Sequence, residues 1–311
     1  MSSRALIGLV ALLAQPPLEA VPGGSRFHRP APSPDGQRIA FTLECGSRHE
    51  AALANLDGTG FRFLTRNDVE DWYPQWSPDG ARVVLFRGAE KVGRGRYRIV
   101  TIEVATGKET PLTGSGFYDG DPAYAPDRHI VFNSDRAGNH DVWIMEADGT
   151  HPRPLTDNPL SDFSPSVHPD GGRLVCVRQE APGYVLELMD LEGGQRAVLD
   201  VGRRDNFKPD WSPDGRSLVF FGPTPGEKPE TETSLAVLRF DVEEARLTRL
   251  SDGAGSDGDP AWSPDGSEVF FVSDRRGRDE LFVMGRDGTD PRSLWSEDTI
   301  ERISKACSGQ R

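Results

Sequence analysis

The chain has 311 residues, of which only 36% are hydrophobic, and it contains 34 glycines and 25 prolines. This much glycine and proline predicts many turns joining many short strands, and it argues against a helical globule. The 36 Lys and Arg residues against 49 Asp and Glu residues leave a net charge of −13. Nucleic acid is therefore not expected as a partner, since phosphate binding needs a basic surface, whereas a cation or a basic protein surface fits better.

The N-terminus contains an apolar run from Ala5 to Ala14, preceded by Arg4. This run is shorter than the ~20 residues that a membrane-spanning helix needs. It is typical of the apolar region of a secretory signal peptide, which we place over residues 1–20. The alternative is that the run is a strand or helix of the fold. We therefore expect a periplasmic or secreted protein without a transmembrane segment in the mature chain.

A ten-residue stretch, "DWYPQWSPDG" from Asp71 to Gly80, recurs along the chain in variant form. The proline of its turn recurs every 43 to 51 residues, a length typical of one four-stranded propeller blade. Apolar residues such as Val83 and Leu85 follow each turn at alternating positions, which places them on one face of a strand. These prolines are Pro34, Pro78, Pro126, Pro169, Pro213 and Pro264.

Further along, several of the units contain an Asp-Gly turn followed by a short last strand. Asp-Gly between apolar runs is a strong hairpin signal. We therefore predict an all-β fold, a six-bladed β-propeller of four-stranded antiparallel blades over residues 27–296, with a C-terminal tail over 297–311. We expect a monomer. The predicted blades span about 27–66, 71–113, 119–157, 162–200, 206–251 and 257–296.

The units resemble the repeat of TolB-type propellers, "DxxPxWSPDGxxIxF…SDRxGxxDIxxMxxDGxxxxxLT", from about Phe27 to Ser296. They are also similar to the propellers of prolyl-oligopeptidase-type proteins. TolB carries an additional α/β domain and those enzymes carry a hydrolase domain, and we expect neither here. The resemblance implies a propeller that makes protein–protein contacts in the cell envelope. In the two "SDR" loops we interpret Asp135–Arg136 and Asp274–Arg275 as pairs that brace loops.

One column of polar residues lies three positions before the first proline of each unit. We expect it to surround one mouth of the central channel, where its carboxylates would bind Ca²⁺, another divalent cation or a basic peptide. The alternative is that each residue only closes a local turn by accepting backbone N–H bonds. The column consists of Asp71, Asp119, Asp162, Asn206 and Asp257, with Phe27 in the first unit, and the candidate metal ligands are its four aspartates.

Departures from the repeat beside this column predict an uneven mouth that suits an extended peptide or a sugar. The alternative is that the aromatic side chains among them pack between blades. Two insertions, over residues 88–97 and 222–233, are expected on the same face, where long loops on a rigid frame often bind ligands. The departing side chains are His28, Arg29, Trp72, Tyr73, Phe207 and Lys208.

The three cysteines have separate predicted roles. Cys176 falls in an apolar core column, which predicts a buried thiol. Cys45 follows the second strand of the first blade, and Cys307 lies in the tail that leaves the last blade. Because the first and last blades of a closed ring are neighbours, we predict a Cys45–Cys307 disulfide, which export would permit.

The sequence contains no Gly-x-Ser-x-Gly, Cys-x-x-Cys or His-Glu-x-x-His motif. The leading hypothesis is an exported, non-catalytic TolB-like propeller that binds a peptide or protein partner at the channel mouth, with or without a divalent cation. No other cofactor is expected. The alternative is a metal-assisted lyase or hydrolase that acts on a carbohydrate.

Overall fold

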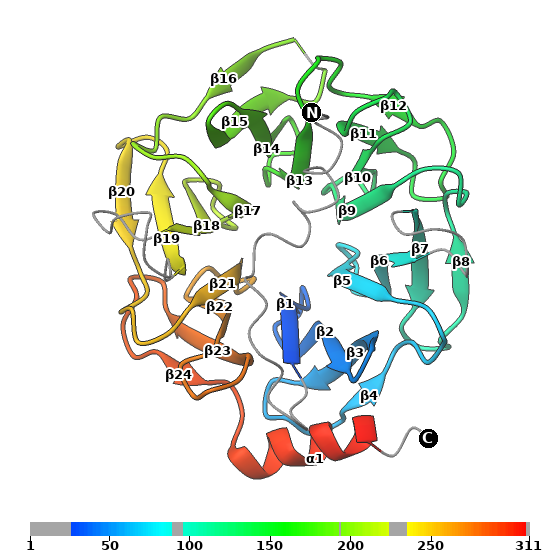
Figure 1. Ribbon diagram of the computed structural model, residues 1–311, viewed down its shortest axis with the longest axis vertical. Helices are drawn as coiled ribbons and strands as arrows, with labels where there is room; N and C mark the ends of the chain where they lie inside the picture. The colour runs from blue at the N-terminus through cyan, green and yellow to red at the C-terminus, as the bar shows by residue number, and fades with distance from the viewer. Residues whose placement is uncertain (1–25, 89–95, 193, 224–234, 309–311) are drawn as a thin grey trace, which may run out of the picture.

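The structure is a computed structural model that describes residues 26–88, 96–192, 194–223 and 235–308. Six four-stranded antiparallel sheets stand around a central axis, so the predicted six-bladed β-propeller is confirmed (Figure 1). In every blade the four strands follow one another in chain order, with the first strand beside the channel and the fourth at the rim. The predicted signal peptide and most of both insertions lie outside the described residues.

The elements of the first three blades are β1 (Arg26–Pro32), β2 (Arg38–Cys45), β3 (Arg48–Asn55), β4 (Arg62–Phe63), β5 (Asp71–Trp76), β6 (Arg82–Gly88), β7 (Tyr97–Glu103), β8 (Glu109–Pro111), β9 (Asp119–Tyr124), β10 (Ile130–Ser134), β11 (Asp141–Met145) and β12 (Arg153–Pro154). Those of the last three are β13 (Asp162–Val167), β14 (Arg173–Glu180), β15 (Gly183–Asp190), β16 (Arg196–Val198), β17 (Phe207–Trp211), β18 (Ser217–Pro223), β19 (Leu235–Asp241), β20 (Arg246–Arg249), β21 (Asp257–Trp262), β22 (Glu268–Ser273), β23 (Glu280–Gly285) and β24 (Arg292–Ser293). One helix comes after them in the described chain, α1 (Glu297–Ser308).

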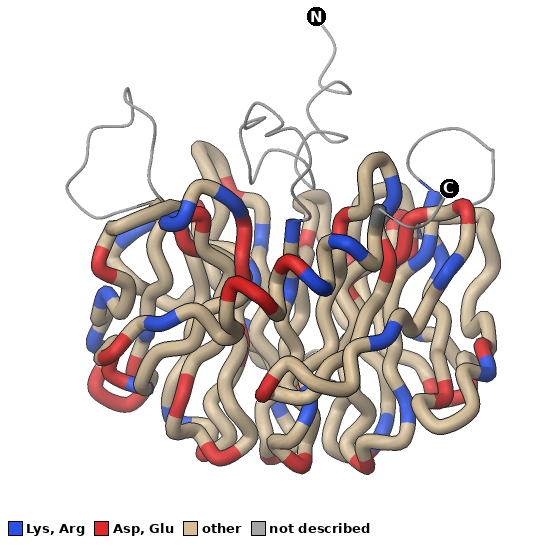
Figure 2. Tube along the Cα trace, turned by 90° about the horizontal axis from the view of Figure 1, so that it is seen from below, with Lys and Arg blue, Asp and Glu red and all other residues tan. Residues whose placement is uncertain are grey.

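The repeated "SPDG" is a turn between the first two strands of a blade. In blade two, the Ser77 hydroxyl donates to Asp79 at 2.6 Å, and the backbone N–H of Ala81 donates to the same oxygen at 3.0 Å. Gly80 takes a φ of 66°, a conformation in which glycine lacks the steric cost of a Cβ. The hydrogen bond from Ser77 is the main reason why the pKa of Asp79 is lowered. These turns share one face of the disc, here called the turn face, and Figure 2 shows acidic residues at loop tips along its lower edge.

Hydrophobic cores lie between neighbouring blades. The core between blades one and two contains Ala40 and Leu53 from one blade and Val83 and Leu85 from the other, all buried. Alternate residues of each strand therefore face opposite neighbours, as the two-residue periodicity predicted. A single blade cannot bury both of its faces alone, so its stability depends on the ring.

The ring closes where blade six meets blade one, and each of these two described sheets keeps its own four strands. A mixed core from both blades fills the junction, and α1 adds Ile300 and Ile303 to it. The indole N–H of Trp295 donates to the Leu56 carbonyl at 3.0 Å, and Arg302 donates to the Gly58 carbonyl at 2.7 Å. Blade six and the helix thus hold the first blade mainly by side chains and not by a β-ladder.

Helix α1 occupies most of residues 297–311, which were predicted only as a C-terminal tail. Glu297 and Asp298 lie in its first turn and Lys305 in its last, an arrangement that the helix dipole favours. Ile300, Ile303 and Cys307 recur at helical spacing and face the blades. No helix among the described residues is long and apolar enough to cross a membrane.

The predicted Cys45–Cys307 disulfide is present and joins β2 to α1 across a sequence separation of 262 residues. Cys176 is free and buried, also as predicted. The disulfide therefore fixes the C-terminal helix to the first blade, at the junction that closes the ring.

We expect Cys307→Ser to lower the free energy of unfolding by about 2–5 kcal/mol, because the variant loses a cross-link that closes a very long loop. Urea denaturation with and without reductant measures this. The wild type should lose stability when reduced and the variant should not change. A fully reduced wild type that is as stable as the oxidised protein would contradict the prediction.

Candidate functional site

The first strand of every blade contains a bulge. The register between this strand and its neighbour shifts in all six blades. At the bulge, six non-glycine residues take positive φ values between 46° and 53°, a costly conformation that re-aims a side chain. We call these six residues the channel ring. They are Arg29, Tyr73, Asp121, Ser164, Lys208 and Asp259.

Side chains of the channel ring meet across the central channel. Lys208 Nζ of blade five lies 2.8 Å from Asp121 Oδ1 of blade three, and the Ser164 hydroxyl donates to the other Asp121 oxygen at 2.8 Å. Lys208 Nζ also lies 4.2 Å from the centre of the Tyr73 ring, which comes from the opposite blade. The cavity that five of the six residues line has room for about one water molecule. The ring therefore plugs the channel.

The electrostatics of the plug favour a stable ion pair. Burial opposes the charged form of Asp121, but the ion pair with Lys208 and the Ser164 hydrogen bond hold its pKa below the usual value. Burial lowers the pKa of Lys208, and Asp121 opposes that shift. Burial also raises the pKa of Tyr73, which keeps the phenol neutral.

The polar column that was predicted to surround the mouth lies elsewhere. Its five polar members are buried at the start of the inner strands, at most 1% exposed, and each aspartate is within hydrogen-bond distance of an arginine. The Asn206 amide donates to the Arg203 carbonyl at 3.1 Å. The four aspartates thus anchor the starts of their blades to arginine side chains, whereas the alternative interpretation had them accept backbone N–H bonds. The ion pairs are Asp71–Arg87 at 2.6 Å, Asp119–Arg136 at 2.7 Å, Asp162–Arg196 at 3.3 Å and Asp257–Arg275 at 3.1 Å.

The physical reason for this correction is the bulge. In each unit the column residue points between the blades, and the bulge turns the residue two positions later into the channel. Arg29, Tyr73 and Lys208 were among the predicted residues and do lie in the channel, whereas Asp121, Ser164 and Asp259 were missed. A signal was available, because each of the six directly precedes the first proline of its unit.

The face opposite the turn face carries the loops that enter each blade, and we call it the mouth face. Its aromatic residues pack between blades. The Trp72 ring stacks on the His49 ring of blade one, with ring centres 3.8 Å apart. The Phe207 ring packs against the Tyr184 ring of blade four, with ring centres 5.3 Å apart. Phe117 and Leu160, in the loops that lead into blades three and four, are 46% and 39% exposed. The mouth face thus combines partly buried aromatic rings with exposed apolar side chains.

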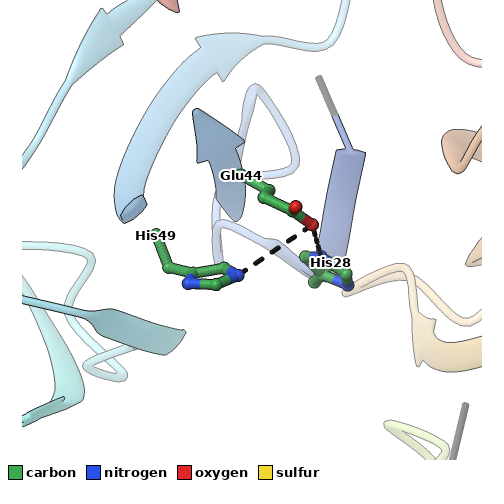
Figure 3. Close-up of side chains that lie close together, drawn as sticks. All are labelled: His28, Glu44 and His49. Atoms are coloured by element: carbon green, nitrogen blue, oxygen red, sulfur yellow. Dashed lines mark ion pairs between the residues drawn. The ribbon is translucent and has the colours of Figure 1, made fainter. Parts of the chain in front are cut away.

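A second polar cluster lies at this face between blades one and two. His28 on β1, Glu44 on β2 and His49 on β3 gather their side chains, with Glu44 Oε2 placed 3.6 Å from His28 Nε2 and 4.0 Å from His49 Nε2 (Figure 3). The polar contact with the His28 imidazole is the main cause that lowers the pKa of Glu44. Burial lowers the pKa of His49 to about 4, so its imidazole is neutral at neutral pH.

A third group, Asp162, Cys176 and Glu187, is fully buried in blade four. Arg196 contacts both carboxylates, and Arg178 also contacts Glu187. Burial raises the pKa of the Cys176 thiol. These arginines already neutralise the acidic groups, so the arrangement is an internal ion network and not an open ligand set.

A comparison of the sequence with models of protein families agrees with the repeated motif and the six sheets. The sequence profile described as the TolB beta propeller domain matches residues 30–236 and 206–309. The chain belongs to the TolB β-propeller family.

Individual relatives of this TolB-family propeller are distant. An uncharacterized protein of Agrobacterium fabrum is 32% identical over 203 residues, which are 60% of this chain and 67% of the relative. The Tol-Pal system protein TolB of Francisella tularensis subsp. mediasiatica is 23% identical over 249 residues, and the match covers 78% of this chain but only 55% of that protein. The crystal structure of TolB from Acinetobacter baumannii superposes with a TM-score of 0.67 at 18% identity, covering 84% of this chain and 67% of that one, which shows a shared fold.

We expect Lys208→Met to lower the free energy of unfolding by about 3 kcal/mol, because it leaves the largely buried Asp121 carboxylate without its cation. The double variant with Asp121→Asn should recover much of this loss, since it removes both charges. A double-mutant cycle by urea denaturation measures the coupling. Additive effects of the two substitutions would show that the pair does not stabilise the plug.

A pH-dependent effect is expected at Glu50, a residue of β3 whose carboxylate lies beside Thr65. Burial raises the pKa of Glu50 to about 7 from an ordinary value of 4.5, although the Thr65 hydroxyl donates to it. The folded state therefore holds this proton more tightly than the unfolded state. The contribution of Glu50 to stability should therefore fall as the pH rises from about 4.5 to about 7.

The variant Glu50→Gln should lose this dependence and be more stable than the wild type above pH 7 by on the order of 2 kcal/mol. The difference should vanish below about pH 4.5, where Glu50 is protonated in both states. Unfolding curves across this range measure it. Glu103→Gln, at a position where the side chain is 38% exposed, is the control. Equal behaviour of both variants would contradict the prediction.

Proposed function

We propose that this TolB-family propeller is an exported, non-catalytic binding protein whose mouth face holds a protein or peptide partner. The observation that carries the proposal is the plugged channel. Lys208, Asp121 and Ser164 satisfy one another's charges and hydrogen bonds, and the remaining cavity is about the size of one water molecule. We therefore expect a ligand larger than a water molecule to bind over the mouth and not in this cavity.

The surface around the mouth supports a macromolecular partner. Exposed apolar side chains in adjacent loops, Phe117 and Leu160, supply the contact area that protein interfaces bury. Arg136 lies 5.6 Å from the centre of the Phe117 ring and adds a cation beside it. Aromatic and arginine side chains are the residues that most often dominate the energetics of such interfaces.

Two further observations support export and association. The Cys45–Cys307 disulfide is typical of oxidising compartments such as the periplasm. The Francisella tularensis relative is named as a protein of the Tol-Pal system, and we extend such an association with partner proteins to this chain. The acidic net charge of −13 favours a partner with a basic surface.

The test is a cross-linking capture from the envelope of the native cell, followed by titration of the purified partner. We expect the double variant Phe117→Ser/Leu160→Ser to weaken binding about tenfold or more, because both substitutions remove buried interface contacts. Val198→Ser is the matched control. Val198 is 44% exposed on β16 at the rim, far from the mouth, so this variant should bind like the wild type.

Equal binding by the double variant and the wild type would contradict the mouth-face proposal. The alternative function, metal-assisted cleavage of a carbohydrate, makes a different prediction. Turnover of polysaccharide by the wild-type protein, with added Mn²⁺, Ca²⁺ or Zn²⁺, would contradict the non-catalytic proposal.

A further inference from the structure

His28, Glu44 and His49 belong to three adjacent strands of one sheet. Glu44 and His49 are directly opposite each other in the β2–β3 ladder, and Arg26, two residues before His28, is opposite Glu44. Side chains two residues apart share a face, so all three project from the same side of blade one, toward blade two. A rigid β-sheet therefore fixes the positions of two imidazoles and one carboxylate.

The two histidines converge on a single oxygen. In Figure 3 both imidazole rings are turned toward Glu44, and both contacts end on its Oε2 atom. One ligand atom from each residue lies within 4.8 Å of the others. Ligands of a tetrahedral ion with 2.0–2.1 Å bonds lie about 3.3 Å apart, so small side-chain rotations would close the observed separations.

A buried nitrogen without a hydrogen bond is a second, independent observation. His28 is only 7% exposed, and its Nε2 atom has no hydrogen-bond partner among the described residues; it faces Glu44 at a distance too long for such a bond. Leaving a buried polar nitrogen unsatisfied is costly, so such an atom indicates a missing partner. A metal ion between His28 and Glu44 would satisfy it.

The surroundings of His49 complete a metal-site arrangement. Its other ring nitrogen, Nδ1, lies 3.8 Å from Glu70 Oε1, and the Tyr97 hydroxyl donates to the second Glu70 oxygen at 3.1 Å. Histidines that bind metals commonly donate their free N–H to a carboxylate, which orients the ring. The Trp72 ring stacks on the His49 ring, with ring centres 3.8 Å apart, and this fixes the orientation of the imidazole.

We propose that His28, Glu44 and His49 form a binding site for a divalent transition metal, with Zn²⁺ as the best-fitting ion. Imidazole nitrogens select such ions over Ca²⁺, and two histidines with one carboxylate leave a fourth position open for water or a partner's side chain. The side chains of Glu44 and His49 are 28% and 16% exposed, which gives the ion a route from solvent. The proposal does not depend on the partner-binding function.

The test is calorimetric titration of metal-stripped protein, free of any polyhistidine tag, with ZnCl₂. We expect one high-affinity site per chain. His28→Gln, Glu44→Gln and His49→Gln should each weaken binding by more than tenfold, and Glu70→Gln by about tenfold, the size of effect known for carboxylates that orient a metal-bound histidine. Co²⁺ should show the visible absorption of a tetrahedral complex in the wild type and lose it in the three ligand variants.

The matched control is His129→Gln, which removes a histidine that lies 2.8 Å from Asp127 and 3.4 Å from Glu146 in blade three. It should bind Zn²⁺ like the wild type. Zn²⁺ should raise the melting temperature of the wild type and of this control but not of the ligand variants. Should the buried His28→Gln fail to fold, the partly exposed Glu44→Gln and His49→Gln decide the question. Absence of stoichiometric Zn²⁺ binding by the wild type, or binding unchanged in these variants, overturns the proposal.

Discussion

Closure of the ring between blades six and one is the constraint on which the rest of this structure depends. Each blade buries one face against each neighbour, so a gap at a single junction would expose two apolar faces. Because the two described sheets share no strand, side chains must supply most of the attachment. The mixed core, the Trp295 and Arg302 hydrogen bonds and the Cys45–Cys307 disulfide all act at this one place. The C-terminal helix is therefore part of the closure and not an appendage.

A closed ring brings six equivalent bulges to one axis, and this explains the chemistry of the channel. The scaffold sets the backbone of the channel ring alike in each blade, with positive φ before a proline. The side chain at that position differs between blades, and so opposite charges can meet across the axis, as Lys208 and Asp121 do. Repetition supplies the geometry, while departures from the repeat supply the charges that pair across the axis.

Local periodicity and turn chemistry were enough to predict the six blades, their order, and a disulfide between the first blade and the chain segment after the last. The same patterns placed the polar column wrongly at the channel mouth. Simple alternation along a strand takes no account of a bulge, and a bulge changes which residue faces the axis. The partners of Asp119 and Asp257 are the arginines of the two "SDR" loops, but adjacency in sequence favours pairing those arginines with the neighbouring aspartates instead. Glu44 and His49 give no sequence signal of their own, because they join His28 only through lateral strand pairing.

The same bulge also explains why two different environments lie side by side at the mouth. His28 and Arg29 are consecutive, yet His28 faces Glu44 between the blades while Arg29 lines the channel cavity. Trp72 and Tyr73 are divided in the same way, with Trp72 on His49 and Tyr73 beside Lys208. An ion or side chain that binds at His28 therefore acts on the backbone segment that also positions Arg29. Because these strands are packed on both faces, the two environments share one rigid backbone segment.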